Sequence, residues 1–162
     1  MTGGAGAPLI AVCGASAATD AEIQVAEAVG RMLATRGAMV VCGGLGGVME
    51  AVCRGAAEAG GTSVGLLPGD DPGAANPHLS LAPATGLGEL RNGLIARVCR
   101  GMIAIGGGYG TLSEVAFMLR LGRPVCAVGS WGLVLPREGG EDATIHRAVD
   151  AGDAVTWVLD RI

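Results

Sequence analysis

Short, fully apolar runs alternate along the chain with longer stretches whose apolar residues recur at helical spacing. The first run covers residues 9–13, and in the stretch 19–36 that follows Val25, Val29 and Met32 share one face. A short apolar run bounded by glycine is typical of a buried strand, and the second pattern predicts an amphipathic helix. This alternation predicts βαβ units around a parallel sheet.

The same pattern continues to about Gly129 and weakens beyond it. The chain contains no linker or repeat, so residues 1–162 are predicted to form a single domain. The first helix is expected to begin with a capping box of Thr19 and Glu22 and to end at Gly37. The segment 131–142 is predicted to be a loop or hairpin. Further strands are expected at 38–42, 62–67, 79–82 (short), 102–105 and 124–128, and further helices at 48–59, 89–100, 111–121 and 153–162.

Glycines gather just past the carboxyl ends of the predicted strands. Gly14, the run 43–47, Gly69 and the run 106–110 all have this position. In an open parallel sheet this edge is where ligands bind, and glycine lets the backbone approach them closely. Helix N-termini at the same edge present free N–H groups to anions. The sequence therefore predicts an anion-binding cradle along one edge.

The strongest motif is IAIGGGYGTLSE at 103–114. Its backbone N–H groups and the Thr111 hydroxyl can hold a phosphate, with Gly107, Gly108 and Gly110 as the predicted contacts. The alternative is that Thr111 and Glu114 are only a T-x-x-E capping box. That alternative accounts for these two residues and not for the glycines.

A second glycine-rich turn, GGLGGVME at 43–50, lacks the G-x-G-x-x-G spacing and follows the second strand. Two explanations of its glycines are equally good. Gly43 and Gly44 contact a ligand, or the glycines only let strand and helix pack tightly. After the first strand, Gly14 and Ser16 are further candidates for phosphate contact. Ser16 can equally hydrogen-bond its own turn.

Composition removes several classes of function. All 11 basic residues are arginine, which excludes a pyridoxal-phosphate decarboxylase and a P-loop kinase, since both need a lysine. The net charge of −4 and the pI near 5.1 argue against a nucleic-acid partner. No apolar run approaches the roughly 18 residues of a membrane span. The five cysteines form no C-x-x-C pair and no signal peptide is visible, which favours the cytoplasm.

Other polar residues are weaker candidates. Asp70 and Asp71 can hold ribose hydroxyls or a metal, although such a turn is more often only a turn. His78 and His146 lack metal-ligand spacing, so no metal site is predicted. The cysteines of the strands are expected to be small buried apolar residues.

The pair GGLGGVMEAV and GGGYGTLSE, with LLPG between them and TGLGELRN before the second, resembles the LOG superfamily over residues 9–128. The resemblance implies a three-layer α/β, Rossmann-like fold with helices on both faces of a parallel sheet. One branch consists of phosphoribohydrolases, which cleave the base–ribose bond of nucleoside 5′-monophosphates such as AMP. The other carries the molybdenum cofactor, a pterin phosphate. LLPGDDPGAANP and ATGLGELRN look closer to the carrier branch.

The resemblance also implies roles for two residues. Glu114 matches the glutamate of the family's PGGxGTxxE turn, and Arg91 matches the arginine of the family's ERK-type helix start. In the hydrolases this pair is catalytic. Three positions depart from that pattern: Asn92 replaces a lysine, Gly106 replaces the proline, and Glu89 precedes Arg91 by two residues instead of one.

We therefore expect a small phosphorylated ligand, either an AMP-like nucleotide or molybdenum cofactor, and no other required cofactor. A single-stranded DNA-binding module is a third possibility, opposed by the acidic charge and the 2% of aromatic residues. Only 16% of the chain is charged, so its alanine-rich helices are expected to expose apolar surface. Together with the resemblance, this predicts a homodimer or homotetramer.

Overall fold

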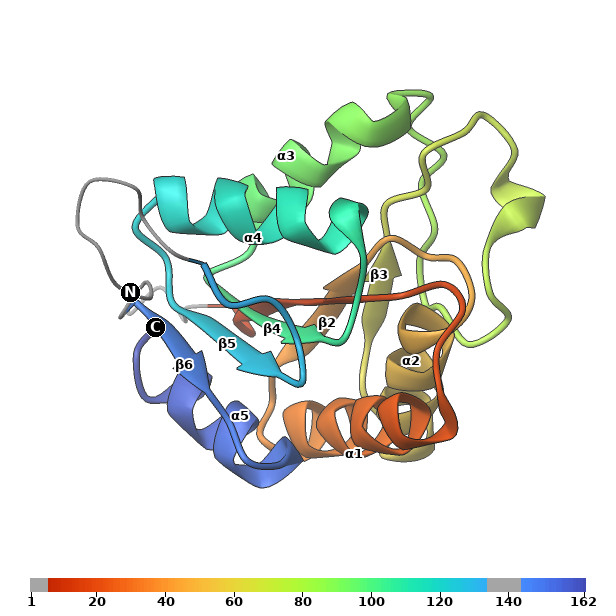
Figure 1. Ribbon diagram of the computed structural model, residues 1–162. Helices are drawn as coiled ribbons and strands as arrows, with labels where there is room; N and C mark the ends of the chain where they lie inside the picture. Colours follow the sequence, from red (N-terminus) through yellow and green to blue (C-terminus); the bar gives the residue numbers. More distant parts are fainter. Residues whose placement is uncertain (1–5, 134–143) are drawn as a thin grey trace, which may run out of the picture.

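In residues 6–133 and 144–162, which the computed structural model describes, six strands form one parallel sheet. Their order is β3-β2-β1-β4-β5-β6, and every neighbouring pair is parallel (Figure 1). The strand order therefore reverses between β1 and β4. The strands are β1 (Leu9–Gly14), β2 (Met39–Cys42), β3 (Ser63–Gly65), β4 (Gly101–Ile105), β5 (Val125–Val128) and β6 (Ile145–Arg147).

Helices cover both faces of the sheet, which confirms the predicted three-layer α/β architecture (Figure 1). Alternate residues of β1 enter different cores: Ile10 and Val12 pack beneath one helical layer, Ala11 and Cys13 beneath the other. The first layer holds α1 (Asp20–Thr35), α2 (Val48–Glu58) and α5 (Ala151–Leu159), and the second holds α3 (Arg91–Val98) and α4 (Tyr109–Arg120). Two short 3-10 turns are η1 (Pro72–Ala74) and η2 (Gly88–Leu90).

The ends of two helices show how local sequence sets the fold. The predicted capping box of Thr19 and Glu22 is confirmed at the start of α1, and Gly37 follows that helix at φ +75°. Helix α4 behaves differently, because its N-cap is Gly108 and no side chain caps it. Thr111 lies inside this helix and is buried. The alternative that Thr111 and Glu114 form only a capping box is therefore wrong.

Several predicted boundaries change. Residues 79–82 form no strand of their own; Leu81 makes one isolated bridge to Val64. Strand β6 was not predicted, and α5 begins at Ala151, capped by the Asp150 side chain. The predicted loop or hairpin at 131–142 falls mostly outside the described residues. Within the described residues no helix is long and apolar enough to cross a membrane.

Candidate functional site

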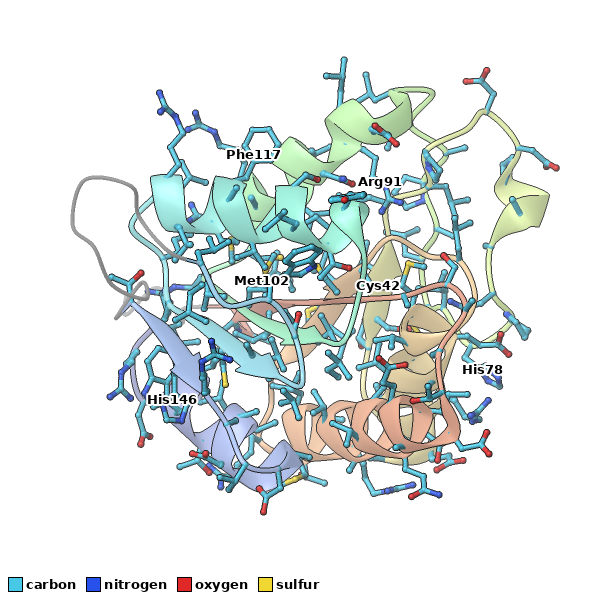
Figure 2. The ribbon with its side chains drawn as sticks, viewed as in Figure 1. Cys42, His78, Arg91, Met102, Phe117 and His146 are labelled. Atoms are coloured by element: carbon cyan, nitrogen blue, oxygen red, sulfur yellow. The ribbon has the colours of Figure 1, made fainter. Side chains whose placement is uncertain are left out.

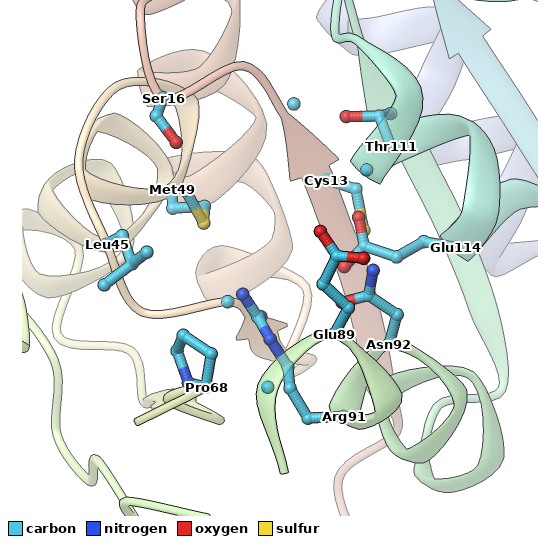
Figure 3. A pocket seen from close by; sticks show the side chains of 14 residues that line it. Cys13, Ser16, Leu45, Met49, Pro68, Glu89, Arg91, Asn92, Thr111 and Glu114 are labelled. Carbon is cyan, nitrogen blue, oxygen red and sulfur yellow. The ribbon is translucent and has the colours of Figure 1, made fainter. Parts of the chain in front are cut away.

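A cavity of about 260 Å³ opens at the carboxyl ends of the central strands, where the strand order reverses between β1 and β4 (Figure 3). This is the position at which open parallel sheets bind ligands. It receives residues from the ends of β1 and β2, from the start of α3 and from the first turns of α4. The lining comprises Cys13, Gly14, Ser16, Gly43, Leu45, Met49, Pro68, Gly88, Glu89, Arg91, Asn92, Gly110, Thr111 and Glu114.

Most of the residues predicted for the site meet in this cavity. The two glycine-rich turns, far apart in sequence, lie on the same edge of the sheet, as predicted. Gly44, Gly107 and Gly108 are the exceptions, because they do not line the cavity. The predicted residues that line it are Gly14, Ser16, Gly43, Arg91, Gly110, Thr111 and Glu114.

Arg91 is the first residue of α3 and is only 9% exposed. Its guanidinium lies against Gly43. Within the described part of the chain, Nε and Nη1 are buried without a hydrogen-bond partner. A buried charged donor left unpaired costs more than an ordinary hydrogen bond contributes. Arg91 is therefore a cation held ready for an anion that enters the cavity.

Glu114, from α4, is the second buried charged residue of the cavity. Burial raises the pKa of its carboxyl to about 6, against the opposing effects of a hydrogen bond with Cys13 and the positive charge of Arg91. Burial and the neighbouring Glu114 carboxylate raise the pKa of the Cys13 thiol well above its usual range. Cys13 is thus a protonated thiol beside Glu114 and not a thiolate nucleophile.

Asn92 joins the two helices that carry Arg91 and Glu114. Its Nδ2 donates to Ser113 Oγ at 2.8 Å, and Ser113 Oγ donates to the Gly110 carbonyl at 2.7 Å. This chain of hydrogen bonds fixes the start of α3 to the first turn of α4. Where the resemblance implies a lysine charge, the structure therefore has a neutral, hydrogen-bonded tether.

The glycines of the two turns differ in what they contact and in their backbone angles. Gly43 faces Arg91, whereas Gly44, at φ +79°, packs on Leu67: a Cβ there would lie 2.7 Å from Leu67 Cδ2. Tight packing thus accounts for Gly44, whereas ligand contact through Gly43, which lines the cavity, stays a prediction. Gly106 has a φ of +53°. Because the proline ring holds φ near −65°, the family's proline would not fit this backbone.

Sequence reasoning did not assign several lining residues to the site. The sequence carries a signal for Met49, which lies in the GGLGGVME turn, and for Pro68, which lies in the LLPG segment. Cys13 is the last residue of the apolar run 9–13, a position that predicts an ordinary core residue. The missed residues are Cys13, Leu45, Met49, Pro68, Gly88, Glu89 and Asn92.

The remaining polar candidates lie elsewhere. Asp71 caps η1 by accepting from the Gly73 N–H at 2.8 Å, as expected for a turn residue. His146 contacts Asp153 at 3.1 Å and stacks on Trp157. No group of three or more potential metal-ligating side chains occurs among residues 6–133 and 144–162. All five cysteines are free and buried.

The family model described as the SLOG cluster4 family matches residues 7–155, and the chain belongs to that family. This confirms the LOG-like resemblance. An uncharacterised protein of Archaeoglobus fulgidus is 38% identical over 119 residues, which are 74% of this chain and 78% of the relative.

Two solved structures resemble the whole fold. The molybdenum cofactor binding protein of Rippkaea orientalis matches with a TM-score of 0.85 and 29% identity, over 95% of this chain and 96% of that protein. The molybdenum cofactor carrier protein of Chlamydomonas reinhardtii matches with a TM-score of 0.78 and 30% identity, over 96% and 98% of the two chains.

Proposed function

We propose that this protein binds the molybdenum cofactor as cargo and carries it without catalysing a reaction. The observation that carries the proposal is the buried guanidinium of Arg91, which lies in the cavity beside the glycine-rich turns. Its Nε and Nη1 have no hydrogen-bond partner among the described residues. A phosphate provides the acceptors that a guanidinium binds best. The likeness to two cofactor-binding proteins over nearly the whole chain supports a pterin phosphate as the ligand.

The lining of the cavity fits an amphipathic ligand. Leu45, Met49 and Pro68 lie on one side, and Thr111 and Glu114 on the other (Figure 3). A flat ring can pack on the apolar side while a phosphate meets the N-terminal turn of α4. At about 260 Å³ the cavity is smaller than the roughly 300–1,000 Å³ of most ligand sites, so part of such a ligand would remain outside.

Nucleoside monophosphate hydrolysis is the second candidate, favoured by Arg91 and Glu114 in one cavity. A carboxylate there can stabilise an oxocarbenium-like transition state or orient the attacking water. Asn92 and Gly106 count against this reaction, because they stand where the resemblance implies the enzymes' lysine and proline.

One experiment separates these functions. The purified protein is mixed with cofactor released from a denatured molybdenum enzyme, passed through a gel-filtration column, and assayed for pterin by fluorescence after oxidation. We expect wild type to retain the pterin and Arg91→Met to lose it. The same preparations are incubated with AMP, and free adenine is measured by chromatography. Adenine release by wild type, abolished in Glu114→Gln, would replace the carrier function with the hydrolase function.

Assembly, location and partners are further proposals. We propose that the protein forms a homodimer or homotetramer in the cytoplasm and has no nucleic-acid partner. Large apolar side chains are exposed on α3, on the η2 turn just before it and on the neighbouring α4. Exposed apolar surface of this kind marks an interface, which supports assembly. These residues are Leu87, Leu90, Leu94, Val98 and Phe117.

A further inference from the structure

The segment that follows β5 contacts the glycine-rich turn between β4 and α4 at three points. The Ser130 hydroxyl donates to the Gly106 carbonyl. Trp131 Nε1 donates to the Gly108 carbonyl at 3.0 Å. The Trp131 ring also stacks on Tyr109, with 5.9 Å between ring centroids and 29° between planes. None of these residues lines the cavity.

These contacts help to fix the direction of two peptide groups, the second of which is also held by the Leu112 N–H, which donates to the Gly108 carbonyl at 3.0 Å. In a trans peptide the carbonyl and the following N–H point in opposite directions. Holding the carbonyls of Gly106 and Gly108 toward the segment after β5 therefore turns the N–H groups of Gly107 and Tyr109 away from it. Strand β5 lies on the far side of β4 from β1, and the cavity lies at β1. The two N–H groups are thus directed toward the cavity side.

The two N–H groups are also free to bind. Neither the Gly107 N–H nor the Tyr109 N–H has a hydrogen-bond partner in the described residues. Gly106 and Gly107 adopt φ values of +53° and +99°, a backbone that glycine reaches easily and also leaves easily. The Gly106 N–H donates to the Val128 carbonyl at 3.1 Å, and the contacts with Ser130 and Trp131 add to this hold on the turn.

We infer that Ser130 and Trp131 are positioning residues that hold the Gly106–Gly108 turn so that the N–H groups of Gly107 and Tyr109 present to the ligand's phosphate. This inference rests on the proposed function. Tyr109 is 83% exposed, so its stack with Trp131 buries little surface. A contribution to overall stability is therefore a poor explanation of the contacts, whereas control of the turn accounts for all three.

The test compares two probes: the fluorescent pterin monophosphate made by oxidising the cofactor, and the same pterin after a phosphatase has removed its phosphate. We expect wild type to bind the first at least ten-fold more tightly. In Ser130→Ala and in Trp131→Phe, which keeps a ring but loses the Nε1 donor, this preference should fall about five-fold. The Kd of the dephosphorylated pterin should not change.

Two controls show whether the effect belongs to the turn. Ser130→Thr retains the hydroxyl and should keep the wild-type preference. Trp157→Phe alters the other tryptophan, which stacks on His146, and should also keep it. An unchanged preference in Ser130→Ala and Trp131→Phe, or an equal weakening of both probes, would overturn the positioning role alone. Equal binding of both probes by wild type would also overturn the positioning role, and wild type that binds neither probe would overturn that role and the proposed function together.

Discussion

The guanidinium of Arg91 lies so close to Gly43 that a Cβ on Gly43 would come within 2.7 Å of Nη2. The two residues are far apart in sequence. Gly43 directly follows β2, which ends at Cys42, and Arg91 is at the start of α3; Figure 2 labels Cys42 and Arg91. Glycine at 43 therefore provides the space in which the arginine side chain lies at the cavity.

This relationship predicts that Gly43→Ala displaces the guanidinium. Because the alanine methyl would occupy its place, we expect at least about ten-fold weaker binding of a pterin phosphate, the scale of one lost hydrogen bond to a charged group. Gly6→Ala is the control, since this glycine lies away from the cavity and a Cβ there meets nothing within 4 Å. Fluorescence titration of the three proteins measures the effect. Equal affinity of Gly43→Ala and wild type would show that the contact is unimportant for binding.

A second prediction concerns the cost of holding Arg91 without a partner. Arg91→Met keeps an apolar stem of similar length and removes the buried, unpaired donors. Without ligand, the variant should be more stable by about 1–3 kcal/mol, because it escapes their desolvation. It should also lose pterin phosphate binding. Urea unfolding of the ligand-free proteins tests the first part, and a less stable variant would contradict it.

Much of this site could be predicted, because both glycine-rich turns follow apolar strands whose carboxyl ends share one edge. Arg91 and Glu114 converge there, as expected from family motifs. The spacing of the motif does not show which of Gly43 and Gly44 lies at the cavity and which packs in the core. The distinction depends on whether the backbone faces Arg91 or Leu67, and that is decided by tertiary packing.

Other features had too little local signal. Strand β6 has three residues, of which only Ile145 is buried, so no apolar run marks it. The T-x-x-E pattern predicts a helix start at Thr111, because this pattern is typical of a capping box, whereas α4 begins at Tyr109 after Gly108. Hydrogen bonds such as that between Asn92 and Ser113 join separate helices, and sequence periodicity carries no information about them.

The proposed assembly leads to a third prediction. Phe117 is 42% exposed and lies beside Gly93 of α3. If this apolar surface is the interface, Phe117→Asp should convert the wild-type dimer or tetramer to a smaller species, since a buried unpaired charge is costly. Val149→Asp, at a residue that is 86% exposed and outside this surface, is the control. Light scattering that gives one subunit mass for wild type would contradict the assembly.

The last prediction follows from the raised pKa of Glu114. Burial raises this pKa from 4.5 to about 6, so the folded protein binds a proton there more tightly than the unfolded chain. The resulting stabilisation is fully present below about pH 4.5 and is lost as the pH rises through about 6. Above that range, the buried carboxylate costs about 2 kcal/mol, the equivalent of this shift.

Glu114→Gln removes this titration and keeps the size of the side chain. At each pH we compare the free energy of unfolding of the variant with that of wild type. The variant should gain about 2 kcal/mol on wild type when the pH is raised from about 4.5 to about 7.5. Every other titrating group is common to both proteins, so their contributions largely cancel. Urea unfolding at the two pH values gives the four free energies needed. A difference that does not change with pH would mean that Glu114 is not desolvated in the folded protein.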